Sequence, residues 1–170
     1  KDILQMANYG VPQSRRRFVL LAGKGFEIPL PKATHAFRGD EKRKLKPWVP
    51  ISDAIKDMPE PVTLSHALTH GGPDNFNWHV LRNLRPISIR RLRATKEGQD
   101  RSVLPDDLRP KCHQGDDEGF QNVYGRMSWN RVSPTITTGC TTPCMGRFGH
   151  PDELRTISIR EAALIQTFPE

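Results

Sequence analysis

Three polar side chains near the N-terminus are spaced so that one strand would present them together. Gln13, Arg15 and Arg17 stand two residues apart, and successive side chains of a strand point to opposite faces. An amide and two guanidiniums would therefore form a row on one face. Because unpaired charge is costly to bury, such a row needs either an anionic partner or solvent. A strand end that simply reaches water is the alternative.

A second basic group lies between Pro86 and Gly98. Proline suits the first position of a helix and glycine its end, so the segment predicts a helix of about three turns. Its basic residues are Arg90, Arg91, Arg93 and Lys96. Such a helix could contact a phosphate backbone by charge, without reading base identity. A solvated amphipathic helix is the alternative.

The cysteines offer one conceivable metal site. Cys112, His113, Cys140 and Cys144 could supply four ligands to zinc. A single, loosely spaced cysteine pair without C-x2-C favours ordinary thiols instead, so we expect no metal. Three cysteines are also too few for a disulfide scaffold, which favours a reducing, cytoplasmic setting.

The composition favours a phosphate-bearing partner and excludes an integral membrane protein. The 170 residues carry 26 Lys and Arg against 19 Asp and Glu, a formal charge of +7. Of the basic residues, 19 lie within residues 1–101. The longest apolar run, at 18–22, is far shorter than the roughly 20 residues of a membrane span. The first residues lack a secretory signal and an initiating Met, so we expect the chain to be part of a longer protein.

Local patterns predict the elements that would position these residues. Residues 13–22 and 132–138 read as strands, and the Pro- and Lys/Arg-rich residues 25–50 read as a basic connector. Residues 52–58 predict a short helix capped by Ser52. A stronger helix spans 159–167, because Ser158 and Glu161 match the S-x-x-E capping box. Residues 62–77 support no prediction.

Two segments resemble one enzyme family. The sequence has no P-loop, no glycine-rich dinucleotide turn, no H-E-x-x-H and no G-x-S-x-G. Tyr9-Gly-Val-Pro-Gln-Ser-Arg-Arg-Arg-Phe, however, resembles the Q-x-R-x-R motif of DNA (cytosine-5) methyltransferases. The residues from Tyr124-Gly-Arg-Met-Ser-Trp through Arg131-Val-Ser-Pro-Thr-Ile-Thr-Thr to Phe168-Pro169 resemble the block that follows the variable region of that family. The order of the segments and their separation also resemble the family.

The resemblance implies a chemistry for the polar row. Members of the family bind S-adenosylmethionine in a doubly wound α/β domain, flip the target cytosine out of the duplex and attack its C6 with a cysteine thiolate. By resemblance, Arg17 would donate to the cytosine O2, where charge develops. Arg15 would help to hold the flipped nucleotide, and Gln13 would lie at the DNA. Thr137, Thr138 and Gly139 would approach the DNA backbone, with a plain strand end as the alternative.

The departures from the family pattern indicate a partial enzyme. The family places its Pro-Cys nucleophile and its Glu-Asn-Val acid before the Q-x-R-x-R motif, and neither motif precedes Gln13 here. The glycine-bearing cofactor loop and the final Asn-Gly motif are absent too. We therefore expect S-adenosylmethionine to be bound outside these residues, and the chain alone to be inactive.

The expected architecture is α/β overall. Residues 1–26 would be an edge of the S-adenosylmethionine-dependent methyltransferase domain, residues 27–130 a small, irregular, β-rich α+β target-recognition domain, and residues 131–170 a motif block with a packing helix. The expected partner is double-stranded DNA, in a bacterial restriction-modification system or as an orphan enzyme. A non-catalytic DNA-binding module, a recognition subunit with a separate catalytic chain, and an enzyme acting on RNA remain alternatives.

Overall fold

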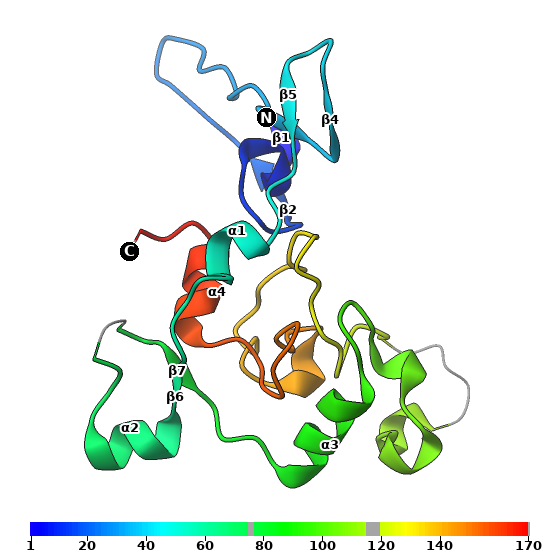
Figure 1. Cartoon of the computed structure of the whole chain (residues 1–170). Helices are drawn as coiled ribbons and strands as arrows, with labels where there is room; N and C mark the ends of the chain where they lie inside the picture. Colours follow the sequence, from blue (N-terminus) through cyan, green and yellow to red (C-terminus); the bar gives the residue numbers. More distant parts are fainter. Residues whose placement is uncertain (75–76, 115–119, 170) are drawn as a thin grey trace.

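Short strands and helices alternate with long irregular segments in this chain (Figure 1). The computed structural model describes residues 1–74, 77–114 and 120–169. Residues 75–76 and 115–119 of the predicted recognition domain, and Glu170 of the last block, lie outside the described residues. No helix in the described ranges has the length and apolar character to cross a membrane. The described part is a mixed α/β structure assembled from small sheets.

The N-terminal residues form a hairpin. β1 (Asp2–Gln5) and β2 (Arg16–Val19) pair antiparallel, with Leu4 opposite Arg17, and the 3-10 helix η1 (Met6–Tyr9) follows β1. The strand expected over 13–22 is therefore shorter than predicted. The Arg15 backbone N–H donates to the side-chain oxygen of Gln5 at 2.7 Å. In a regular strand pair it would donate to a backbone carbonyl of the neighbouring strand instead. Regular pairing begins only at Arg16.

The segment expected to be a basic connector contains a small sheet, so that prediction was wrong for residues 35–47. Its order is β3 (His35–Ala36), β5 (Leu45–Pro47), β4 (Arg38–Asp40), with β5 parallel to β3 and antiparallel to β4. The Trp48 indole N–H donates to Asn8 Oδ1 at 2.8 Å, and the Thr34 N–H donates to the Asn8 carbonyl at 2.9 Å. Strands of two or three residues show no alternation, so tertiary bonds to Asn8 decide this structure.

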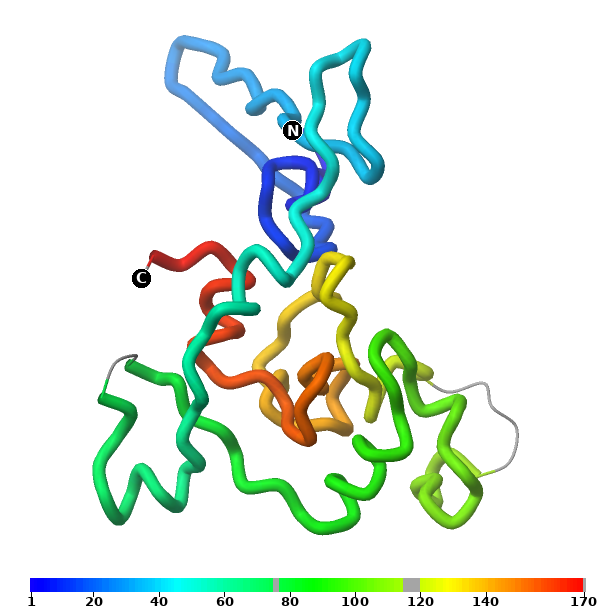
Figure 2. The backbone as a smooth tube through the Cα atoms, viewed as in Figure 1, coloured from blue at the N-terminus to red at the C-terminus, as the bar shows by residue number. Residues whose placement is uncertain are grey.

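The main core lies between two short helices and the irregular chain that precedes the second one. α1 (Ser52–Ile55) packs against α4 (Ile159–Ile165). The buried apolar side chains of the core are Ile51, Ile55, Met127, Ile136, Cys140, Phe148, Ile157, Ala162 and Ile165. The chain from about 125 to 157 winds through the centre of the lower part in Figure 2. These contacts fix the residues that precede α4.

The predicted helix starts are confirmed for α3 (Pro86–Ala94) and α4, but the predicted cap of α1 is not. The capping box of α4 is confirmed: Ser158 Oγ accepts the Glu161 N–H, and Glu161 Oε2 accepts the Ser158 N–H. The cap predicted for Ser52 was wrong, because Ser52 is the first helical residue and its hydroxyl donates to Asp53 instead. α3 is confirmed with Pro86 in its first turn, but it ends at Ala94 because Thr95 is extended.

The remaining elements are a small parallel sheet, the helix within it and several 3-10 turns. β6 (Val62–Thr63) and β7 (Val80–Leu81) pair parallel, and α2 (Leu64–His70) lies between them in sequence. Four 3-10 turns follow: η2 (Arg101–Val103), η3 (Asp106–Leu108), η4 (Lys111–His113) and η5 (Pro143–Met145). The strand predicted at 132–138 was wrong, because only Ser133 forms an isolated bridge. Pro134 lacks the N–H that a continuous ladder needs.

Candidate active-site segment and nucleic-acid interface

Two segments more than 100 residues apart are joined by hydrogen bonds. Gln13, which is 1 % exposed, accepts the Ile136 N–H with its side-chain oxygen at 3.3 Å. The Ser14 N–H donates to the Ser133 carbonyl at 2.8 Å, and the Ser133 N–H donates to the Pro12 carbonyl at 2.9 Å. The Thr135 hydroxyl adds a bond to the Ser14 carbonyl at 2.8 Å. We call these bonds between residues 12–15 and 133–136 the junction.

Arg15 lies where the junction meets a cavity. Its Nη1 donates to the Ile136 carbonyl at 3.1 Å, and its side chain is half-buried. The cavity has a volume of about 540 Å³. Besides Arg15, its lining comprises Trp78, Ile136, Thr137, Thr138, Cys140, Thr141, Ile159, Ala162, Ala163, Gln166 and Phe168. The guanidinium is therefore held by the second motif block, at the edge of a largely apolar space.

Arg17 does not join Arg15 at this cavity. It lies on β2, is exposed, and donates from its Nη1 to the Arg16 carbonyl at 2.8 Å. The row expected on one strand face is therefore divided: Gln13 makes a buried structural bond, Arg15 borders the cavity and Arg17 lies outside it. The reason is that strand geometry, and with it strict alternation, begins only at Arg16.

Two of the three residues expected near the DNA backbone line the same cavity, and the third, Gly139, lies next to them in sequence. Thr137 and Thr138 line it, and the Thr137 carbonyl accepts the Cys140 N–H at 3.1 Å. Gly139 follows in a turn, where a Cβ atom would lie 2.6 Å from Met145 Cγ. Glycine is needed here because Met145 closes over the backbone. These residues are brought together with Arg15, although not by a strand.

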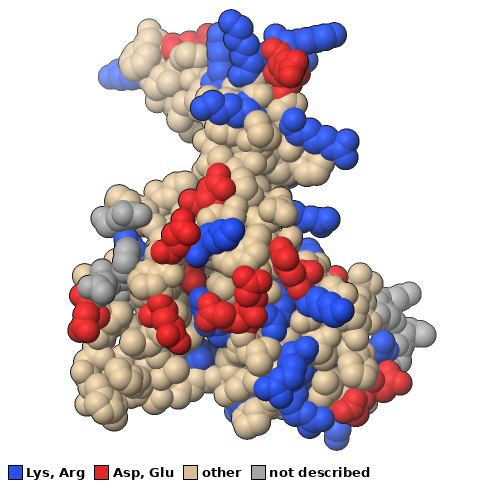
Figure 3. Space-filling view, viewed as in Figure 1, with Lys and Arg blue, Asp and Glu red and all other residues tan. Residues whose placement is uncertain are grey.

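The basic residues of α3 have different surroundings. Arg90 forms an exposed ion pair with Asp107 at 3.4 Å, whereas Arg91 donates to the Leu108 carbonyl at 2.7 Å. Arg93 and Lys96 are exposed. Figure 3 shows Lys and Arg gathered on the upper part of the molecule and again over α3, with Asp and Glu between them. The predicted phosphate-binding helix is thus basic at its surface, but its charges do not form one uniform group.

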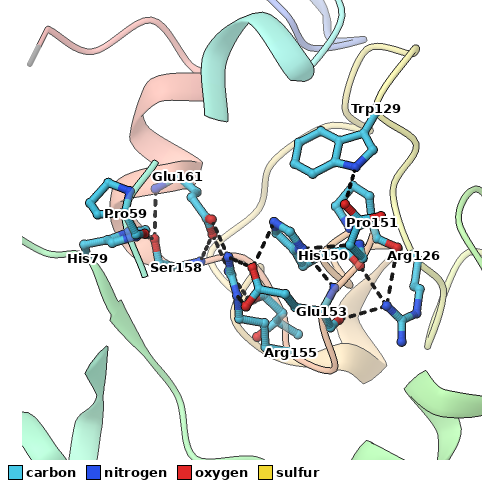
Figure 4. Close-up of polar contacts among 12 residues, drawn as sticks. Pro59, His79, Arg126, Trp129, His150, Pro151, Glu153, Arg155, Ser158 and Glu161 are labelled. Atoms are coloured by element: carbon cyan, nitrogen blue, oxygen red, sulfur yellow. Dashed lines mark hydrogen bonds and ion pairs between the residues drawn. The ribbon is translucent and has the colours of Figure 1, made fainter. Parts of the chain in front are cut away.

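A buried ionic cluster at the start of α4 was not found from the sequence (Figure 4). Arg155 donates to both carboxylate oxygens of Glu161, at 2.7 and 2.8 Å, and to both of Glu153, at 2.8 and 2.9 Å. Burial acts to lower the pKa of Arg155, but the bonds to the two carboxylates outweigh it and raise that pKa. The hydrogen bond from Arg155 lowers the pKa of Glu153. The cluster fixes α4 against the preceding loop.

Two further polar side chains organise this loop from inside. His150 is 5 % exposed, and its Nδ1 accepts the N–H groups of Asp152 and Glu153 at 3.3 and 3.1 Å. Burial lowers the pKa of His150. Arg126 donates to the carbonyls of His150, Pro151 and Glu153 (Figure 4), and also to the carbonyl of Leu92. One guanidinium therefore ties the end of α3 to the loop before α4.

The 540 Å³ cavity does not fit S-adenosylmethionine. That cofactor carries a sulfonium and an α-ammonium group besides its carboxylate, yet the only charged side chain lining the cavity is the cation Arg15. Within residues 1–74, 77–114 and 120–169, no three His, Cys, Asp or Glu side chains are grouped to hold a metal. All three cysteines are free thiols, Cys112 and Cys144 exposed and Cys140 buried.

Pro143 and Cys144 form a Pro-Cys pair, the pair that carries the nucleophile in the family. The pair follows the Q-x-R-x-R segment, whereas the family nucleophile precedes it. Cys144 lines a different cavity from Arg15, together with Arg82, Arg85 and Arg91. Neither the place of Cys144 in the sequence nor its cavity is the one expected of the nucleophile. Arg82 and Arg85 were missed by the sequence analysis, and the only signal for them was their charge beside Pro86.

Comparison with known proteins identifies the family. The profile described as C-5 cytosine-specific DNA methylase matches residues 1–170. The type II methylase M.HgiDII of Herpetosiphon aurantiacus is 35 % identical over 169 residues, which are 99 % of this chain and 44 % of that protein. The type II methyltransferase M1.BsuMI of Bacillus subtilis is 35 % identical over 171 residues, 99 % of this chain and 35 % of that protein.

A plant protein matches over the same share of the chain. DNA (cytosine-5)-methyltransferase 3 of Arabidopsis thaliana is 25 % identical over 211 residues, 99 % of this chain and 15 % of that protein. The chain thus spans less than half of the length of each of these relatives. With the family profile matched from its first residue to its last, this chain belongs to the C-5 cytosine-specific DNA methylases.

Proposed function

We propose that this chain is the C-terminal, DNA-recognising part of a cytosine-5 DNA methyltransferase. It binds duplex DNA, holds a flipped cytosine, and supports methyl transfer from S-adenosylmethionine to C5. The nucleophilic cysteine and the cofactor site lie outside these residues. The observation that carries the proposal is the junction, because it seats Arg15 against the Ile136 carbonyl at the edge of the cavity.

Arg15 and Arg17 have different parts in this proposal. Arg15 uses Nη1 for Ile136 and has other N–H donors for the flipped nucleotide and its backbone. Arg17 donates an exposed hydrogen bond to the Arg16 carbonyl, and a nucleotide oxygen can replace that carbonyl as the acceptor. Arg17 then donates to the cytosine O2 as charge develops on the ring, which lowers the barrier. The junction positions Arg15 before the reaction, whereas Arg17 exchanges its bond to Arg16 for the bond to the nucleotide.

The other predicted contacts act on the DNA backbone. Thr137 and Thr138 supply short side chains beside Arg15, and Gly139 follows them without a side chain, so that a nucleotide backbone can approach closely. Gln13 supports the site through the junction. The exposed cations of α3 attract phosphates by charge. Base identity is then read by other residues of the region 27–130.

The test uses the complete natural protein that contains this chain. Arg17→Ala should lower kcat for methyl transfer by roughly 100-fold or more, the cost of losing one donor to a developing charge. Arg15→Ala should also lower kcat, because the flipped nucleotide is then less well positioned. The dissociation constant for duplex DNA should change far less. The matched control is Arg16→Ala, which removes the same charge from the intervening position and should leave kcat near its original value.

Equal losses of kcat and affinity would make Arg15 and Arg17 ordinary phosphate contacts and overturn the assignment. Methyl transfer by the 170-residue chain alone would overturn the placement of the nucleophile outside it. Duplex binding that requires no partner, in a protein without any methyl transfer, would instead identify a non-catalytic module. Activity restored by mixing two polypeptides would identify a split enzyme.

A further inference from the structure

A second cavity lies between the N-terminal part of α3 and the loop that ends in η5. Its volume is about 280 Å³. Three arginines, Arg82, Arg85 and Arg91, line it, and none of the described residues in its lining is acidic. Its other lining residues are Asn83, Leu84, Ile87, Ser88, Tyr124, Thr142, Pro143 and Cys144. We call this cavity the arginine pocket.

Two of the guanidiniums are held in place by the protein. Arg82 donates from Nη1 to the Thr142 hydroxyl at 3.1 Å, across the pocket from its own segment. Arg91 donates from Nε to the Leu108 carbonyl, and its guanidinium carbon lies 4.7 Å from the centre of the Tyr124 ring. Each of these hydrogen bonds uses one of the five N–H donors that an arginine carries. The remaining donors are available to a ligand in a fixed arrangement.

The electrostatics of the pocket differ from those of the adjacent surface. Arg90, the neighbour of Arg91, is paired with the carboxylate of Asp107. The three arginines of the pocket have no carboxylate among the described residues that line it. Like charges gathered without a counter-ion repel one another, and a bound anion relieves this repulsion. Guanidinium groups match phosphate oxygens in geometry, and so favour phosphate over a simple halide ion.

We propose that the arginine pocket seats one phosphate group of the DNA backbone, with Arg82, Arg85 and Arg91 as its hydrogen-bond donors. The proposal rests on the proposed function for the identity of the ligand, and it deepens that function by assigning the phosphate contact. One water occupies about 30 Å³, so the pocket has room for a phosphate with part of its hydration.

The first test is the salt dependence of duplex binding by the complete natural protein. Arg82→Gln combined with Arg85→Gln should reduce the slope of log K against log salt by about 1, because one phosphate is no longer neutralised. The matched control, Lys42→Gln with Lys44→Gln, removes the same charge from exposed residues outside the pocket and outside α3, and should leave the slope of log K against log salt nearly unchanged. Equal reductions in both variants would overturn the proposal, because the protein would then attract DNA through its total charge.

The second test measures directly whether the arginine pocket is occupied, and it does not depend on methyltransferase activity. Cys144 lines the pocket and is exposed. In a Cys112→Ser background, iodoacetamide labelling of Cys144 is followed by peptide mass spectrometry. Saturating duplex DNA should protect Cys144 almost completely in the parent protein, and the Arg82→Gln, Arg85→Gln variant should lose that protection at equal DNA occupancy.

Inorganic pyrophosphate separates the two sources of a phosphate. Protection by pyrophosphate with none by bound DNA would overturn the DNA assignment and indicate a small phosphate-bearing ligand. Protection by neither would overturn the pocket as an anion site. If the protein shows no salt-dependent duplex binding at all, the proposed function fails, while the pyrophosphate arm still decides whether the arginine pocket binds phosphate.

Discussion

Replacing Arg155 should destabilise the protein strongly, because it leaves a buried charge without its partner. Glu161 is 0 % exposed, and Arg155 is its bidentate partner. In Arg155→Met, the Glu161 carboxylate keeps its bond to the Ser158 N–H, at 2.6 Å, but loses both guanidinium bonds. Breaking a buried pair by removing one partner costs about 3–5 kcal/mol. We expect a loss of that size in the free energy of unfolding.

The assay is urea unfolding followed by tryptophan fluorescence. Trp129 reports on the affected region, because its indole donates to Asp152 at 2.8 Å and its ring meets His150 edge-on. Replacing Trp48 and Trp78 with Phe in every variant of the 170-residue chain leaves Trp129 as its only tryptophan. The midpoint should fall while the dependence of the unfolding free energy on urea stays constant, since the same surface is exposed on unfolding.

A matched control uses the same substitution in a surface pair. Arg43 lies 3.7 Å from Asp40 with its side chain 80 % exposed, and exposed pairs contribute about 0–1 kcal/mol. Arg43→Met should therefore have little effect. Adding Glu161→Gln to Arg155→Met should restore part of the stability, because the orphaned charge is gone while the amide oxygen still accepts from Ser158. An Arg155→Met variant no less stable than Arg43→Met would refute the reasoning.

Two other predictions concern the same part of the molecule. Burial holds the pKa of His150 below its ordinary value of 6.5, so the unfolded chain takes up a proton first as the pH falls. Stability should therefore be full above about pH 6.5 and decrease below it, down to the folded pKa, and unfolding midpoints in His150→Gln should lose this dependence. Gly125→Ala should cost about 1–3 kcal/mol in thermal or urea unfolding, because a Cβ there would lie 2.5 Å from the Gln99 carbonyl oxygen. Gly72→Ala, with no atom within 4 Å of the new Cβ, is the control and should be nearly neutral; equal costs at Gly125 and Gly72 would contradict this packing argument.

The sequence predicts elements whose signals are local. The Ser158 and Glu161 capping box and Pro86 at a helix start are each complete within a few residues, and both helices are present. The segment 132–138 has β-prone residues, but it forms no strand, because a strand needs a partner along its length and only Ser133 finds one. The sheet at 35–47 depends on Asn8, which lies far away in the sequence. Neither outcome is contained in a local pattern.

The sequence singled out several residues of the candidate site but not their arrangement. Arg15, Thr137 and Thr138 were chosen separately, and the structure places them in the lining of one cavity. The division between Arg15 and Arg17 follows from Gln5, whose side chain occupies the Arg15 N–H and delays the start of β2. The arginine pocket could not be predicted at all, because it brings residues 82–91 together with Thr142. Such contacts exist only once the chain is folded.

The junction also closes the chain between residues 15 and 133 into one long loop. Its bonds link residues 119 to 123 positions apart, the extremes being Ser14 to Ser133 and Gln13 to Ile136. The entropy cost of closing a flexible loop grows slowly, by about 0.6 kcal/mol for each doubling of its length. Inserting or exchanging chain inside this loop therefore adds little to the cost of bringing Arg15 to its carbonyl. A chimaera that exchanges the segment between the two halves of the junction can acquire a new recognition surface while the junction stays intact.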